Sequence, residues 1–102
     1  MQEINSQEWQ QKTASDRDAV ILDVRTDEEV EEGMIPGAKQ LNISDPATFM
    51  DKANQLDKSK SYYIYCRSGG RSAQACAVLE SIGFENTYNL LGGIIDWDGP
   101  VE

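Results

Sequence analysis

The loop around Cys66 contains the residues of this chain that are best suited to chemistry. The apolar run YYIY at residues 62–65 precedes the loop CRSGGR at residues 66–71, and a helical pattern over residues 72–82 follows at once. Successive backbone N–H groups in such a loop form an anion cradle, and the helix N-terminus adds partial positive charge. A thiol in this setting has a depressed pKa and is largely thiolate at neutral pH. The loop therefore predicts a nucleophilic Cys66 that handles an anionic substrate; the alternative is a structural cysteine that ends a strand.

The neighbouring loop residues suggest how a substrate would be held. Gly69 and Gly70 let the backbone curl, so that its amides approach a bound atom closely. The guanidinium of Arg71 can fork onto the oxygens of a sulfonate or phosphate, and Arg67 is expected at the mouth of the pocket. Plain surface charge is the alternative for both arginines.

Two serines complete the predicted binding loop. Ser68 either offers a side-chain donor or occupies a plain loop position, and Ser72 is expected to cap the following helix and to donate its N–H to the cradle. The chain has no histidine, which excludes Ser-His-Asp and Cys-His catalysis and any histidine-ligated metal site. The loop itself must therefore activate Cys66.

The second cysteine, Cys76, falls on the same helical face as Leu79 and Ile82. This placement predicts a buried thiol that acts as a small hydrophobic side chain. The alternative is a resolving cysteine for an oxidised Cys66, which the length of the intervening helix disfavours.

Composition limits the class of protein. At 102 residues, the chain is expected to be a single domain spanning residues 1–102. Its net charge of -9 argues against a nucleic-acid partner, and no apolar stretch approaches the ~20 residues of a membrane span. The cytoplasm is the default location, since no signal-peptide pattern is present; the alternative is a mature exported form from which a signal peptide was removed. The acidic run at residues 27–32 is either a solvated helix face or a docking patch for a basic partner protein.

Strand and helix patterns alternate along the chain, which predicts a mostly parallel sheet covered on both faces. Helices are expected from Asn5 to about Thr13, after Thr26, from Pro46 to about Leu56, over residues 72–82 and around residues 94–97, and strands at residues 19–22, 39–43, 61–65 and 87–91. Ligands in such sheets bind beyond the C-terminal ends of the strands, where Cys66 lies.

Four segments of the chain resemble the rhodanese-type sulfurtransferases. The loop CRSGGRS at residues 66–72 looks like the active-site loop of that family, and LDVR at residues 22–25, GMIPGA at 33–38 and LGGI at 91–94 resemble its other elements. The order and spacing match over residues 3–98. The resemblance implies an α/β three-layer sandwich with a mostly parallel central sheet.

The resemblance also implies roles for several residues outside the loop. It implies a structural ion pair between Arg25 and Glu29, although two unrelated surface charges would also fit. Met34 stands where the family usually has histidine, and we expect a packing change rather than a loss of activity. Asp23, at the end of a buried strand, is expected to hold loop amides, with a role in the site as the alternative.

The function that the resemblance implies is sulfur transfer through a persulfide on Cys66. A donor such as thiosulfate would supply sulfane sulfur, and a thiol or cyanide would accept it, without metal or organic cofactor. Phosphatases of the same fold have a loop one residue longer, so a phosphatase or arsenate reductase is the less favoured alternative. A persulfide carrier or sensing module that docks one protein partner is another. The protein is expected to be a monomer or weak homodimer.

Overall fold

Strands and helices alternate along the whole chain in the computed structural model, which describes all 102 residues. The elements are β1 (Gln2–Ile4), α1 (Ser6–Ser15), β2 (Ala19–Asp23), α2 (Asp27–Glu31), β3 (Lys39–Gln40), α3 (Pro46–Asn54), β4 (Ser61–Tyr65), α4 (Gly70–Ser81), β5 (Asn86–Leu90) and the 3-10 turn η1 (Ile94–Asp96).

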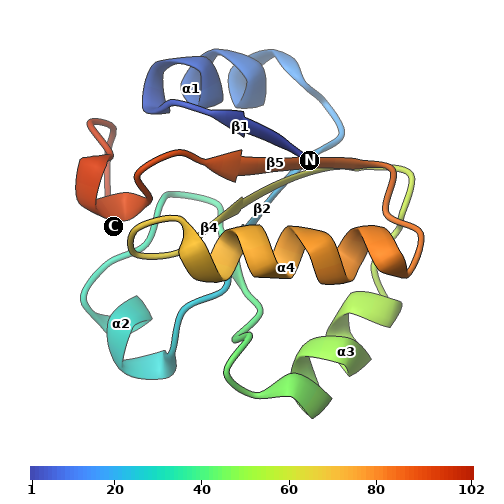
Figure 1. Cartoon of the computed structure of the whole chain (residues 1–102). Helices are drawn as coiled ribbons and strands as arrows, with labels where there is room; N and C mark the ends of the chain where they lie inside the picture. Colours follow the sequence, from blue (N-terminus) through green and yellow to red (C-terminus); the bar gives the residue numbers. More distant parts are fainter.

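The strands form one parallel sheet in the order β1-β5-β4-β2-β3. In Figure 1, α1 lies above the sheet, and α3 and α4 lie on the opposite side. The predicted α/β sandwich with helices on both faces is therefore confirmed. The central strand β4 ends at Tyr65, so Cys66 lies at the C-terminal edge of the sheet.

Alternate residues of β4, together with Cys66 directly after it, contribute to two separate cores. Tyr62, Ile64 and Cys66 pack against α3 and α4 in a cluster that includes Phe49 and Leu79. Tyr63 and Tyr65 face the other side, where Trp9 of α1 is the central residue of the second cluster. Because both faces of the strand are buried, its residues 62–65 form an unbroken apolar and aromatic run rather than an alternating pattern.

Side-chain caps fix the starts of three helices as the sequence predicts. Asn5 accepts a hydrogen bond from the Glu8 N–H at 2.9 Å, Thr26 and Glu29 form a reciprocal capping box, and Asp45 precedes the N1 residue Pro46. Each cap satisfies a backbone N–H group that has no partner within its helix.

The structure differs from the sequence analysis at three places. The strand β1 was not predicted, because it is short and Ile4 is its one buried residue. The strand β3 covers two residues rather than the expected 39–43. The helix α4 begins at Gly70 with Gly69 as its N-cap, so the prediction that Ser72 caps the helix is wrong.

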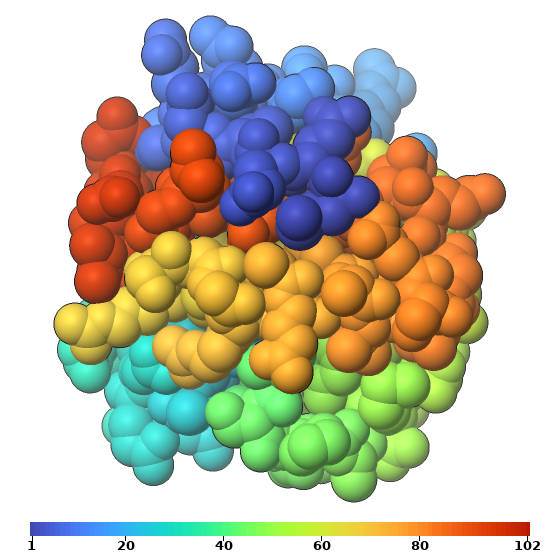
Figure 2. All heavy atoms as spheres, viewed as in Figure 1, coloured from blue at the N-terminus to red at the C-terminus, as the bar shows by residue number.

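The N-terminal segment covers the free edge of β5. Strand β1 pairs with β5, and the Met1 ammonium lies 2.7 Å from a carboxylate oxygen of Glu80 in α4. Figure 2 shows these N-terminal residues (dark blue) directly against α4.

None of the helices has the length and apolar character needed to cross a membrane.

Candidate active site

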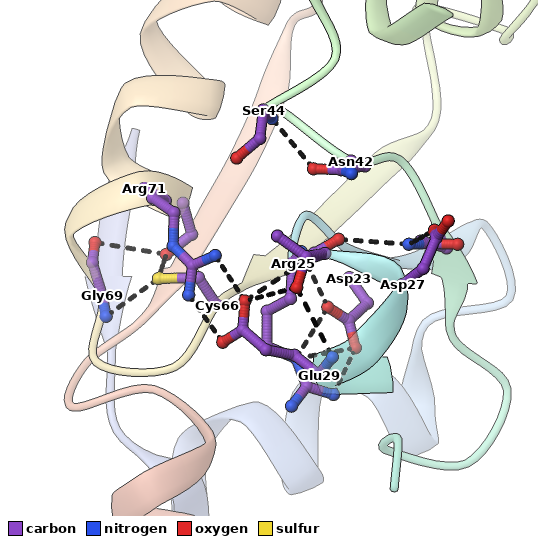
Figure 3. A network of polar contacts seen from close by, with 12 residues as sticks. Asp23, Arg25, Asp27, Glu29, Asn42, Ser44, Cys66, Gly69 and Arg71 are labelled. Atoms are coloured by element: carbon purple, nitrogen blue, oxygen red, sulfur yellow. Dashed lines mark hydrogen bonds and ion pairs between the residues drawn. The ribbon is translucent and has the colours of Figure 1, made fainter. Parts of the chain in front are cut away.

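The turn between β4 and α4 surrounds the Cys66 sulfur with donors. Cys66 is almost fully buried, at 1% exposure. Its Sγ accepts hydrogen bonds from the Gly69 N–H at 3.1 Å and from the Ser72 hydroxyl at 3.3 Å. Figure 3 shows the sulfur facing Gly69 at the start of α4. The structure therefore brings Cys66, Gly69 and Ser72 together, as the sequence predicts for an anion cradle.

These donors lower the pKa of Cys66. Burial alone raises the pKa of the thiol, but hydrogen bonds from the Ser72 hydroxyl and from the backbone N–H groups of Ser72, Gly69 and Ser68 outweigh it, so the pKa of Cys66 is below its ordinary value of 9.0. The Ser68 side chain is exposed and makes no hydrogen bond, so this residue acts on the thiol through its backbone.

Two glycines permit the tight course of the loop. Gly69 has φ +109°, a left-handed conformation that other residues rarely adopt. Gly93 lies so close to the loop that a Cβ there would come within 2.3 Å of the Arg67 carbonyl oxygen. This close approach lets Ile94 and Ile95 donate their N–H groups to the carbonyls of Cys66 and Arg67 at 3.0 and 3.1 Å. The turn η1 therefore fixes the start of the loop.

Arg71 and Glu29 form a two-pronged ion pair between α4 and α2. The two terminal guanidinium nitrogens of Arg71 lie 2.7 and 2.8 Å from the two carboxylate oxygens of Glu29 (Figure 3). The predicted ion pair between Arg25 and Glu29 is therefore wrong. In this structure Arg71 is held by Glu29, and its role in binding a donor stays a prediction.

Arg25 instead pairs with Asp23 in a buried network. Its guanidinium donates to both carboxylate oxygens of Asp23 at 2.7–3.1 Å, and Asp23 also accepts the backbone N–H of Arg25 and the hydroxyl of Tyr65. The Tyr65 hydroxyl accepts the Ile35 N–H in turn. The prediction that Asp23 holds a loop amide is confirmed. This network ties the segment around Ile35, next to Met34, to the central strand.

A pocket of about 270 Å³ lies beside the loop. Its lining consists of Arg25, Glu29, Glu32, Arg67, Ile94 and Ile95. The exposed Arg67 lines this pocket and has no carboxylate partner, whereas Arg25 is paired with Asp23. Arg67 therefore lies at a pocket next to the loop, and its role in meeting a substrate there stays a prediction. Gly70 is exposed at the first turn of α4, with open space around it.

The buried Asn89 of β5 completes the polar environment of Cys66 and was not predicted. Its Nδ2 donates to the Gly69 carbonyl at 3.2 Å, and its Oδ1 accepts the Ser72 hydroxyl. Asn89 is fully buried. Asparagine is depleted in β-strands, so its presence inside β5 was the sequence feature that could have drawn attention to this position.

Cys76 lies in the core between α4 and the sheet, as predicted. Burial, with a smaller contribution from the Glu80 carboxylate, raises the pKa of Cys76 to about 12. Cys76 is therefore a neutral core side chain, and Cys66 is the thiol with the lowered pKa.

Comparison with known proteins agrees with this fold and site. The family model described as rhodanese-like domain matches residues 6–99. This chain belongs to the rhodanese-like domain family. It is 40% identical over 102 residues to the Bacillus subtilis protein named "Putative sulfurtransferase YtwF", covering 100% of this chain and 95% of that protein.

Two further comparisons cover most of the chain. A protein of Allochromatium vinosum named sulfurtransferase is 41% identical over 95 residues, which are 93% of this chain and 86% of that protein. The crystal structure of a rhodanese-like domain protein from Staphylococcus aureus superimposes with a TM-score of 0.86 at 37% identity, covering 100% of this chain and 97% of the other.

Proposed function

We propose that this protein is a sulfurtransferase that carries sulfane sulfur on Cys66. The single observation that supports this most strongly is the pair of hydrogen bonds to the Cys66 sulfur, from the Gly69 N–H at 3.1 Å and the Ser72 hydroxyl at 3.3 Å. These donors stabilise a thiolate without a histidine. Membership of the rhodanese-like family and the two relatives named as sulfurtransferases add support.

In the first step, the Cys66 thiolate attacks the outer sulfur of thiosulfate or a similar donor. A new S–S bond forms at Cys66, the S–S bond of the donor breaks, and sulfite leaves with the electron pair of that bond. Because sulfite departs as a stable anion, this step requires no general acid. The product is a persulfide anion on Cys66.

In the second step, an acceptor thiolate or cyanide attacks the terminal sulfur of the persulfide. The S–S bond at Cys66 breaks, and the Cys66 thiolate leaves with its electron pair. The backbone N–H groups of residues 67–72 and the N-terminus of α4 hold the anion between the two steps. The loop thus stabilises a nucleophile, a persulfide and a leaving group in succession.

We assign to Arg67 the binding of an anionic sulfur donor at the pocket. Arg25 and Arg71 are each held by a carboxylate, whereas Arg67 lines the same pocket without one. Ile94 and Ile95 form an apolar side of the same pocket.

A turnover assay with thiosulfate and cyanide tests this function. Formation of thiocyanate should be lost in Cys66→Ser and retained in the matched control Cys76→Ala. Retention of more than a few per cent of the activity in Cys66→Ser would refute the role of Cys66. A separate phosphatase assay with an aryl phosphate as substrate should show no hydrolysis.

A carrier that delivers its sulfur to a basic protein is a second candidate function. Glu29 lies in the acidic helix α2 and Glu32 is its C-cap, and both line the same pocket as Arg67. Two carboxylates therefore lie beside the loop. A basic acceptor would be attracted there. This function predicts sulfur transfer to a basic protein acceptor that weakens with salt and with Glu32→Gln; equal transfer by that variant would contradict it.

A further inference from the structure

Ser72 has more acceptors within reach than it can satisfy. Its hydroxyl lies 3.3 Å from the Cys66 sulfur, 3.2 Å from the Gly69 carbonyl oxygen, and closer still to Oδ1 of Asn89. A hydroxyl carries one hydrogen and can therefore donate to one of these acceptors at a time. The Gly69 carbonyl already accepts the Ala73 N–H and the Asn89 amide, which makes it the weakest competitor.

The orientation of the Asn89 amide is fixed by its other contacts. Its Nδ2 donates to the Gly69 carbonyl at 3.2 Å and to a carboxylate oxygen of Glu3 at 3.4 Å. Both partners are acceptors, so the NH2 group must face them, and Oδ1 must face Ser72. Oδ1 can only accept, so it competes directly with the Cys66 sulfur for the Ser72 hydrogen.

We propose that Asn89 is a positioning residue that holds the Ser72 hydroxyl while the Cys66 sulfur is uncharged and releases it when that sulfur is a thiolate. In the thiol and in the persulfide, Sγ carries no charge, and the hydroxyl donates to Asn89. In the thiolate, the charge on Sγ makes it the stronger acceptor, and the hydroxyl rotates toward it. The change is a rotation about the Ser72 Cβ–Oγ bond, and the thiol proton goes to solvent.

The catalytic role of this rotation rests on the proposed function. The rotation would affect the rates of the two sulfur-transfer steps differently. Asn89 makes ionisation of Cys66 less favourable than it would be with a free Ser72, and it thereby keeps the thiolate reactive. Ser72 assists Cys66 most when the thiolate departs in the second step. The two residues therefore act on Cys66 in opposite directions.

The charged groups around this cluster come from three elements. Arg71 of α4 acts on Cys66 through its charge and is itself paired with Glu29 of α2, and Glu3 of β1 accepts from Asn89. Substitutions at Ser72 or Asn89 replace none of these charged side chains, and Asn89→Leu removes the hydrogen bond to Glu3 in both backgrounds of the double-variant test below. Differences between such variants therefore report on the hydroxyl and the amide.

The test is the pH profile of Cys66 alkylation by iodoacetamide, which requires no sulfur transfer. At pH 7, Asn89→Leu should react about threefold faster than the unaltered protein, and Ser72→Ala about threefold slower, as expected for the loss of one competing or one stabilising hydrogen bond. Asn89→Asp, whose carboxylate is a stronger acceptor, should react more slowly. Thr87→Val, on the same face of β5 but next to Cys76, should match the unaltered protein.

The double variant Ser72→Ala with Asn89→Leu decides between positioning and plain structural support. If Asn89 acts through the Ser72 hydroxyl, Asn89→Leu has no effect on the profile when that hydroxyl is absent. The same shift in both backgrounds, or a slower reaction of Asn89→Leu, would overturn the proposal. If the proposed sulfur transfer itself is wrong, thiosulfate fails to load Cys66, yet this alkylation cycle still gives its own answer.

Discussion

At the scale of the residue, this protein distinguishes two buried thiols by the groups that surround them. Cys66 and Cys76 are both nearly inaccessible, and burial raises the pKa of each. Cys66 also accepts hydrogen bonds from Gly69 and Ser72, whereas at Cys76 burial in the hydrophobic core outweighs the smaller effect of the Thr87 side chain. Donors, rather than exposure, therefore make Cys66 the candidate nucleophile.

Selective alkylation follows from this difference. Near pH 8, limited iodoacetamide should add one label to the folded protein, and peptide mapping should locate it at Cys66. Because the pKa of Cys66 is lowered, its rate should approach its plateau at a lower pH than that of an ordinary thiol, whereas Cys76, with a pKa of about 12, should react after unfolding. Labelling of Cys76 in the folded protein would contradict this distinction, and Cys66→Ser is the control.

At the scale of the element, the turn from β4 into α4 depends on the conformation of one glycine. Gly69 has φ +109°, whereas the adjacent Gly70 has an ordinary φ and open space around its Cα. Gly69→Ala should lower the free energy of unfolding by about 1 kcal/mol and slow alkylation of Cys66, because the strained turn would move the amide that faces the sulfur. Gly70→Ala is the matched control and should preserve both, as urea unfolding and alkylation rates would show. Equal effects of the two substitutions would mean that φ at Gly69 is unimportant.

The ion pair between Arg71 and Glu29 connects α2 to the loop and should give stability that depends on pH. The Arg71 guanidinium lowers the pKa of Glu29 from 4.5 to about 2. Because the folded-state pKa is the lower one, this contribution is complete above pH 4.5 and is lost as the pH falls toward 2.

The substitution Glu29→Gln should remove this contribution while it preserves the capping box with Thr26, where glutamine is also accepted. The expected loss at pH 7 is about 1 kcal/mol, shrinking to nothing in acid. Thermal unfolding across this pH range would measure it, with the exposed Glu28→Gln as control. A loss that persists at pH 2 would show that the ion pair is not its cause.

The elements that could be predicted from the sequence are those whose sequence signals lie within one short segment. The caps Asn5, Thr26 and Asp45 and the apolar strands lie in short segments, so their elements were expected in the right places. Strand β1 has one buried residue and forms because it pairs with β5, which is distant in the chain. The partner of Glu29 likewise depends on where α2 lies beside α4, and the pairing with Arg25 that the family resemblance implied was wrong.

At the scale of the whole molecule, the net charge opposes the reaction that the loop favours. A charge of -9 repels an anionic donor at long range, and Arg67 attracts it only near the pocket. Raising the ionic strength from about 0.01 M to about 0.1 M shortens the Debye length from about 30 Å to about 10 Å.

We therefore expect kcat/KM for thiosulfate to rise severalfold over this range, because screening removes more repulsion than attraction. Alkylation by the uncharged iodoacetamide should stay constant, which controls for a change in the thiol itself. A fall of kcat/KM with added salt would instead show that the local field of Arg67 dominates.

The central claim is that Cys66 carries sulfane sulfur, and the mass of the intact protein tests it most directly. After incubation with thiosulfate and rapid desalting, the protein should gain the mass of one sulfur atom, and cyanide or a thiol should remove it. Cys76→Ala should gain the same mass, and Cys66→Ser should gain none. Sulfur loading that persists in Cys66→Ser, or no loading of the unaltered protein by thiosulfate or other sulfane-sulfur donors, would contradict the claim.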